Sequence, residues 1–214
     1  IDNKLDKLTK RRNQMSSNAG FPNYRDYAHR RKGRFDYTPE DCLAFHDAIE
    51  QEMVPLLKEL HNERRAALGI DSVRPWDTAN DPHGRSPLKP FDQVSKLIHH
   101  TQSIFDQLDS DLAGWFRTMH ELDLLDLANR KGKAPGGYQD SLAEARMPFI
   151  FMNAIGVQRD VETLLHEAGH AFHTMACQNE PLYSYRHAPI EFCEVASMAM
   201  ELLGGEYLGE FYDT

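Results

Sequence analysis

The sequence predicts a mainly α fold, a multi-helix domain with a small β hairpin or sheet directly before a histidine-rich helix. Apolar residues recur at intervals of three and four through several long stretches, as they do in amphipathic helices. Between residues 131 and 157 this periodicity changes, and the run at 148–152 favours strands. A stretch rich in proline, residues 70–90, separates two helical regions.

The first 69 residues are predicted to form three helices. Residues 4–17 and 24–31 form the first two, with a glycine- and proline-containing break between them. Thr38-Pro39 supplies an N-cap and a proline at the first helical position, which starts the third helix. This helix is expected to end at Gly69 and to be kinked by Pro55 in its interior.

The proline-rich stretch divides the chain into three predicted parts. We expect an N-terminal helical segment at 1–69, a connector at 70–90 and a second part at 91–214. The second part opens with a helical pattern that starts at Val94, is interrupted at Asp109-Ser110-Asp111 and is expected to continue to Ala128.

The strand-forming segment lies just before the histidine-rich helix. Gly136-Gly137 and the run at 148–152 predict a short antiparallel hairpin or small sheet. An exposed strand edge can hold a peptide in extended form by main-chain hydrogen bonds. A hairpin that only covers the core fits the same pattern, so both interpretations stay open.

The most informative segment is His166-Glu167-Ala168-Gly169-His170, an H-E-x-x-H motif in a helical stretch. Positions four apart lie on one face of a helix, so His166 and His170 can point two imidazoles at one metal ion. Glu167 lies about 100° further round the helix and can reach a water molecule on that metal. The apolar residues fall on the opposite face, which packs into a core.

A zinc site needs a third protein ligand. His173 lies seven residues beyond His166, about 10.5 Å along the helix axis, which is too far for both to share one tetrahedral ion. A second helix, predicted from Ala188 to Leu203, carries the better candidates. Glu194 is the first choice and Glu191 the second. Both share a face with Glu201, opposite the apolar face that contains Phe192, Ala196, Ala199 and Leu203.

Composition excludes several classes of function. The net charge of −9 argues against nucleic acid as a partner, because phosphate binding needs a basic surface. No run of eighteen apolar residues is present, so we expect no membrane span. The three cysteines are odd in number and widely spaced, which favours a reducing compartment and hence a cytoplasmic protein. No feature predicts an oligomeric state.

These motifs resemble those of the thimet oligopeptidase and oligoendopeptidase F family of zinc metallopeptidases. The likeness rests on Thr163 to His173 and on Glu191-Phe192-Cys193-Glu194-Val195-Ala196-Ser197, and it extends upstream to segments 132–138 and 148–153. The resemblance implies a zincin-like domain with one Zn²⁺ per chain. It also implies that His166, His170 and Glu194 are the metal ligands and that Glu167 is the general base.

The implied activity is endopeptidase hydrolysis of oligopeptides by a metal-activated water. The family's members are several hundred residues long and carry downstream His and Tyr residues that contact substrate. We therefore expect residues 91–214 to be the zinc-binding part of a catalytic domain truncated at its C-terminus. Tyr183, Tyr185 and His187 precede the helix of Glu194, and His187 is a candidate to line the site. The alternative is an inactive or truncated helical module that binds zinc or peptides without cleaving them.

Overall fold

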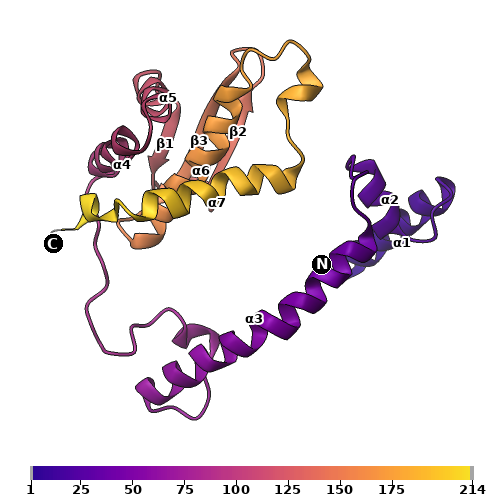
Figure 1. The fold of residues 1–214 in the computed structure, drawn as a ribbon, viewed down its shortest axis with the longest axis horizontal. Helices are drawn as coiled ribbons and strands as arrows, with labels where there is room; N and C mark the ends of the chain where they lie inside the picture. Colours follow the sequence, from indigo (N-terminus) through magenta and orange to yellow (C-terminus); the bar gives the residue numbers. More distant parts are fainter. Residues whose placement is uncertain (1, 213–214) are drawn as a thin grey trace. The chain divides into compact units, whose positions relative to one another are not determined.

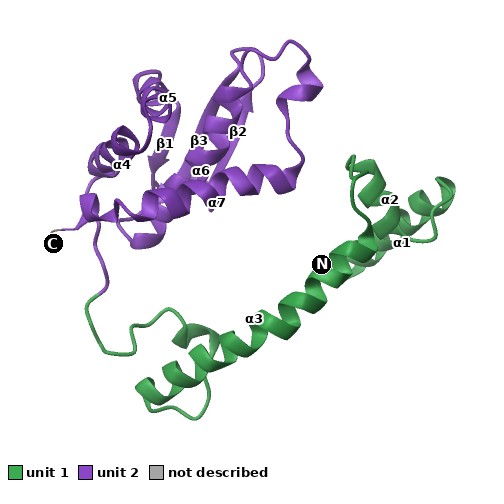
Figure 2. Cartoon of the chain, viewed as in Figure 1, with its two compact units in different colours: residues 1–86 green, residues 87–214 purple. Residues whose placement is uncertain are grey.

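The computed structural model describes residues 2–212 and is mainly helical, with one small three-stranded sheet (Figure 1). The predicted fold class is therefore confirmed. The chain divides into two compact units, residues 1–86 and residues 87–214 (Figure 2). That division falls inside the proline-rich stretch, while the three-part division at 69 and 90 stays a prediction. Among residues 2–212, no helix combines the length and the apolar character that a bilayer span requires.

The first unit consists of helices, as the sequence predicts. Its elements are α1 (Asp2–Asn18), α2 (Tyr24–Arg31), α3 (Pro39–Leu68) and the short 3-10 helix η1 (Pro75–Asp77). Helix α3 continues through Pro55 and ends at Leu68, and Gly69, the predicted C-cap, has a left-handed conformation with φ of 64°.

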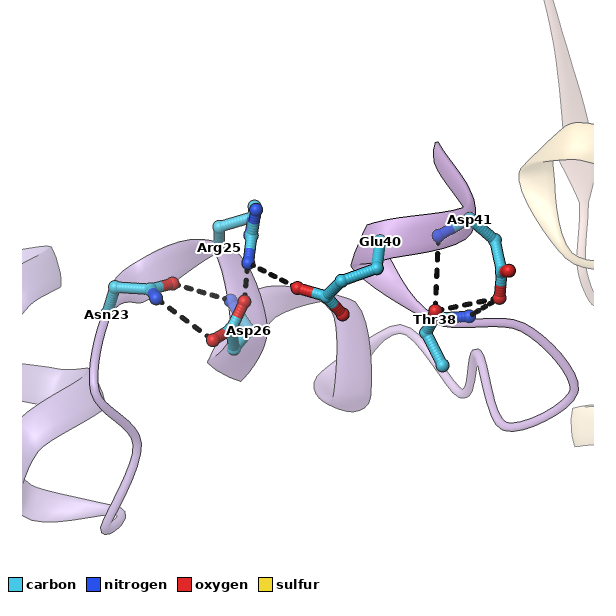
Figure 3. A network of polar contacts seen from close by, with 6 residues as sticks. All are labelled: Asn23, Arg25, Asp26, Thr38, Glu40 and Asp41. Carbon is cyan, nitrogen blue, oxygen red and sulfur yellow. Dashed lines mark hydrogen bonds and ion pairs between the residues drawn. The ribbon is translucent and has the colours of Figure 1, made fainter. Parts of the chain in front are cut away.

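A network of polar contacts fixes the starts of α2 and α3 (Figure 3). The hydroxyl oxygen of Thr38 accepts a hydrogen bond from the Asp41 amide, and the Asp41 carboxylate accepts one from the Thr38 amide. This reciprocal pair is a capping box, which satisfies two amides that the helix itself leaves unpaired. Arg25 bridges from Asp26 on α2 to Glu40 on α3, at 2.8 and 3.1 Å.

The second unit packs helices against the sheet. Its elements, in chain order, are α4 (Val94–Leu108), α5 (Ser110–Glu121), β1 (Leu125–Ala128), β2 (Tyr138–Leu142), β3 (Met147–Ala154), α6 (Gln158–Ala176), η2 (Tyr183–Arg186), α7 (Ile190–Gly205) and η3 (Leu208–Phe211). Helix α6 packs against β2 and β3, and α4, α5 and α7 all contact α6 (Figure 1). The buried core lies between these layers and includes Leu97, Phe105, Phe116, Ile150, Leu164, Leu165 and Phe172.

The sheet has the strand order β1-β3-β2. Strands β2 and β3 form the predicted antiparallel hairpin, whereas β1 pairs with β3 in parallel. The expected helix up to Ala128 is therefore wrong, because α5 ends at Glu121 and the chain turns into β1. Asp123, with φ of 55°, makes the turn between them. Strand β2 is an edge strand, since β3 is its one partner within the described residues.

Helix α7 packs with the face that the sequence marks as polar. Ser197 and Gly204 are its buried residues, and the apolar side chains of Phe192 and Leu203 remain 64% and 50% exposed. Helix α7 has an apolar face and an acidic face, as the sequence predicts. The acidic face, however, is the one that lies against α6.

Candidate metal centre

Helix α6 presents two imidazoles to one side because its other side is held in the core. Leu164, Leu165 and Phe172 are buried against α4, α5 and the sheet. His166 and His170 lie one turn apart on the opposite side, with ring centroids 4.9 Å from each other. The apolar stripe of the helix therefore fixes the direction in which the two histidines point.

Glu194 on α7 completes a group of three possible metal ligands. Its Oε2 lies 3.4 Å from His166 Nε2 and 3.8 Å from His170 Nε2. One donor atom from each of these three residues lies within 4.8 Å of the other two. Glu191 and His173 are not in this group, and the Nε2 of His173 instead lies 3.9 Å from the Sγ of Cys177.

The absence of a side chain at Gly169 allows Glu194 to come this close. A Cβ at Gly169 would lie 2.6 Å from the Cα of Ser197 and 2.7 Å from the carbonyl oxygen of Ala196. Both of those atoms are backbone, so they cannot rotate out of the way. The second variable position of H-E-x-x-H is thus the place where α6 and α7 cross, and glycine is the residue that fits there.

Further contacts orient the three residues. Oε1 of Glu201, two turns beyond Glu194, lies 2.6 Å from His166 Nδ1. The backbone of Cys193 supplies a hydrogen-bond acceptor to His170. Ser197 donates its hydroxyl to Oε2 of Glu194 at 3.1 Å. The sequence pattern places Glu201 on the same helix face as Glu194 but predicts no role for it. Its seven-residue spacing from Glu194 was the available signal.

Glu167 is almost enclosed, with 8% of its surface exposed. Burial raises the pKa of its carboxyl above the ordinary value, while a backbone hydrogen bond from Gln139 on β2 acts in the opposite direction. Burial also lowers the pKa of His170. The imidazole of His170 is therefore held in its neutral form at neutral pH, the form that binds a metal.

The donor set can be tested against the requirements of zinc. Bonds of about 2.0–2.2 Å with tetrahedral angles place neighbouring ligand atoms roughly 3.3–3.6 Å apart. The separations of 3.4 and 3.8 Å from Glu194 to the two histidines are close to this range. Two imidazole nitrogens and one carboxylate oxygen are a combination found in hydrolytic zinc sites. The hydrogen bond of a histidine to a carboxylate behind it is also typical of such sites.

Comparison with known proteins assigns the chain to a family. Residues 2–212 match the model of peptidase family M3. The chain belongs to peptidase family M3. Its resemblance to the thimet oligopeptidase and oligoendopeptidase F family is thereby confirmed.

Individual relatives agree with the assignment to family M3. Oligopeptidase PepF of Bacillus subtilis is 37% identical over 155 residues, and group B oligopeptidase PepB of Streptococcus agalactiae is 27% identical over 168 residues. Among solved structures, PZ peptidase A with an inhibitor matches 99% of this chain with a TM-score of 0.91 and 31% identity. A Bacillus anthracis protein assigned as an oligoendopeptidase F matches 100% of this chain, with the same TM-score and 29% identity.

This M3 chain spans only part of its relatives. The matched region covers 72% of the chain but 23% of B. subtilis PepF, and 78% of the chain but 27% of S. agalactiae PepB. In the two solved structures it covers 37% and 39% of the matching chain. The group of His166, His170 and Glu194 lies inside the matched part of the family model.

Proposed function

We propose that this chain contains the metal centre of a zinc-dependent endopeptidase that hydrolyses peptide bonds in oligopeptides. The observation that carries the proposal is the group formed by His166, His170 and Glu194, with the buried carboxyl of Glu167 beside it. Membership in peptidase family M3 supports the same reaction class.

In this proposal His166, His170 and Glu194 hold one Zn²⁺ ion. When bound, zinc lowers the pKa of water at its open position to about 7 and polarises the carbonyl oxygen of the substrate. Glu201 fixes the tautomer of His166 by accepting its Nδ1 proton, so that Nε2 is left free to bind the metal. The backbone of Cys193 accepts a hydrogen bond from the ring of His170 and orients it in a similar way.

Glu167 is the proton carrier. Its carboxylate takes a proton from the attacking water and then delivers it to the nitrogen of the leaving amine. The raised pKa suits both steps, because a base whose pKa is closer to neutral pH also gives up its proton as an acid. The hydrogen bond from the Gln139 backbone fixes the carboxyl beside the edge strand β2.

The substrate would lie along β2 in extended form. One edge of β2 pairs with β3, and within the described residues no strand pairs with its other edge. An added peptide strand can hydrogen bond to such an edge whatever its side chains are, which fits a peptidase for diverse oligopeptides. The names of the relatives, oligopeptidase and oligoendopeptidase, point to the same substrate class. A cytoplasmic location stays a prediction that cell fractionation would test.

The metal assignment is tested by the zinc content of the purified chain, measured by elemental mass spectrometry. We expect about one zinc per chain, as a single site of this type implies. Glu194→Ala should lose most of it, whereas Glu191→Ala, one turn earlier on the same helix, should keep it. Loss in the Glu191 variant alone would assign the third ligand to Glu191 instead.

The role of Glu167 is tested by Glu167→Gln. This variant should keep its zinc, because Glu167 is not one of the three ligands, and it should lose peptide hydrolysis by a factor of about 100 or more. Hydrolysis is followed with a fluorescence-quenched oligopeptide, using the longest form of the protein that contains this chain. A variant with full zinc and unchanged turnover would exclude Glu167 as the base.

A further inference from the structure

A cavity lies near the candidate metal centre, at the C-terminal end of α6. Its volume is about 240 Å³, and its walls come from β2, the β2–β3 turn, the last turn of α6 and the segment that includes η2. Ser141, Thr174, Arg146, Arg186 and His187 are among the residues that line it. His187, which the sequence suggested for the metal site, therefore belongs to this cavity.

Strand β2 and helix α6 connect the cavity to the candidate metal centre. Thr174, on its wall, is one turn beyond His170 and donates its hydroxyl to the His170 carbonyl at 3.3 Å. The hydroxyls of Thr174 and Ser141 lie 3.1 Å apart and join the helix to the strand. One helical turn is about 5.4 Å and an extended peptide advances about 3.3 Å per residue, so the wall at Thr174 is about two residues away from the bond to be cleaved.

The charges of the cavity are unusual for this chain. Two guanidinium groups, of Arg146 and Arg186, line it together with one carboxylate, that of Asp140. The chain as a whole has a net charge of −9. A separate cavity at the other side of the metal centre has the reverse balance, with three glutamates and one arginine.

Both arginines keep donors available. Arg146 uses one N–H group to reach the carbonyl of Gln178, at 3.0 Å. Arg186 uses two, toward the carbonyls of Glu180 and Pro181 at 2.7 and 3.3 Å. A guanidinium has five N–H donors in a planar fork that matches a carboxylate. These backbone contacts hold the two side chains in place and leave N–H groups free for a ligand.

The position of Arg146 also carries a conformational cost. Its φ is 56°, in the left-handed region where a residue with a Cβ is disfavoured and where glycine or asparagine is usual. If backbone conformation alone determined the residue at this position, glycine or asparagine would be expected. An arginine there is consistent with a need for its side chain in the cavity.

We propose that this cavity binds a carboxylate group of the peptide substrate, about two residues from the cleaved bond. The carboxylate is that of an aspartate or glutamate side chain, or that of a free C-terminus. The two guanidinium groups bind it by charge-assisted hydrogen bonds. Describing this peptide as a substrate rests on the proposed peptidase function, whereas the binding itself can be measured without hydrolysis.

The test uses fluorescence anisotropy with the 214-residue chain and short labelled peptides that are otherwise uncharged. One pair differs by an internal Glu or Gln, and both members have amidated C-termini. A third peptide carries the Gln and a free C-terminal carboxylate. We expect one of the two carboxylate peptides to bind about tenfold more tightly than the neutral one, and which of them does so identifies the source of the carboxylate. Equal binding of all three, or no measurable binding, would overturn the proposal.

Variants of the chain assign the effect to the cavity. Arg146→Gln and Arg186→Gln should each reduce the preference, and the double variant should remove it. Arg186→Lys should keep part of it, because a lysine retains the charge without the fork. Arg117→Gln is the matched control, because this arginine pairs with Asp106 in the same unit without lining the cavity. Circular dichroism confirms that each variant is folded. A preference that persists in the folded double variant would refute the assignment.

A zinc measurement on the same samples separates this proposal from the peptidase proposal. His170→Ala should lose zinc and retain the preference for the carboxylate peptide. A wild-type chain that discriminates between the peptides without containing zinc would support the cavity and contradict the metal centre. A wild-type chain that contains zinc but binds all the peptides equally would support the metal centre and contradict the carboxylate-binding cavity.

Discussion

Gly169 on α6 and Ser197 on α7 mark the point where the two helices of the metal centre come closest. A Cβ on Gly169 would lie 2.6 Å from the Cα of Ser197, a distance that real structures essentially never show. Three residues before Ser197 lies Glu194, and the residue directly after Gly169 is His170. The separation of the helices at this crossing therefore sets the distance between the carboxylate and the imidazoles.

Gly169→Ala should for this reason weaken zinc binding. The added methyl group pushes α7 away from α6, so that Glu194 can no longer approach both histidines. We expect the zinc affinity, measured by competition with a chelator, to fall by a factor of about 10–100, comparable to the loss of a contact that orients a ligand. We also expect a loss of stability of about 1–3 kcal/mol from overpacking.

The matched control for this change is Gly205→Ala. Gly205 lies in α7, and a Cβ there would have no atom within 4 Å. Alanine is favoured over glycine inside a helix by about 0.5–1 kcal/mol, so this variant should be unchanged in zinc affinity and slightly more stable. Equal zinc affinities for the two variants would mean that the crossing does not control the site.

Glu201 is predicted to support the centre by orienting His166. Glu201→Ala should lower zinc affinity by a factor of about 10–100, and Glu201→Gln should lower it less, because the amide oxygen still accepts the Nδ1 proton. Glu206→Gln, at an exposed position just after α7, is the control. Chelator competition that gives wild-type affinity for Glu201→Ala would remove Glu201 from the metal centre.

Asp126 is predicted to make part of the folding stability dependent on pH. Hydrogen bonds from Arg130 and then from Lys133 lower the pKa of Asp126 from 3.8 to about 2, and the Lys133 side chain is only 1% exposed. Because the pKa is lower in the folded state, the contribution to stability is complete above about pH 4 and is lost as the pH falls toward 2.

Asp126→Asn should therefore cost about 1–2 kcal/mol near pH 7, since it leaves the buried ammonium of Lys133 without its counter-charge. The difference from wild type should shrink as the pH is lowered from about 4 toward 2. Urea unfolding over this range measures it, with Glu144→Gln as an exposed control from the same unit. A difference that does not change with pH would contradict the assignment.

The capping box at the start of α3 gives a prediction for the first unit. Thr38→Ala removes the acceptor for the Asp41 amide and should cost about 1 kcal/mol. Thr38→Ser keeps the hydroxyl and should be close to wild type. Thermal unfolding followed by circular dichroism compares the two, and equal losses would show that the methyl group of Thr38 matters rather than its oxygen.

Sequence patterns predicted most of what depends on local interactions. The caps at Thr38 and Gly69 follow from residues a few positions apart, and the structure has both. The imidazoles of His166 and His170 lie on one side of α6 because helical spacing requires it. The next helix could also be expected to bring a carboxylate to them, since Glu194 lies on a single acidic face of α7, and the structure places Glu194 beside both histidines.

Features that depend on tertiary contacts could not be predicted in the same way. The leucine-rich segment that ends in β1 fits a helix by its spacing, and only pairing with β3 makes it a strand. The acidic face of α7 had no local reason to pack inward. It does so because Gly169 allows a close crossing, and the apolar side chains on the other side of α7 are left exposed.

The connection between α6 and α7 has a consequence for folding kinetics. The entropic cost of closing a loop grows with the logarithm of its length, so residues 177–189 add only a modest cost to the meeting of the two helices. Only Asp109 separates α4 from α5, so we expect pulse-labelling hydrogen exchange to show protection in α4 and α5 no later than in α6 and α7, with zinc shortening the delay. Earlier protection of α6 and α7 in the absence of zinc would contradict this order. If zinc shortens the delay, the metal acts during folding as well as in the finished protein.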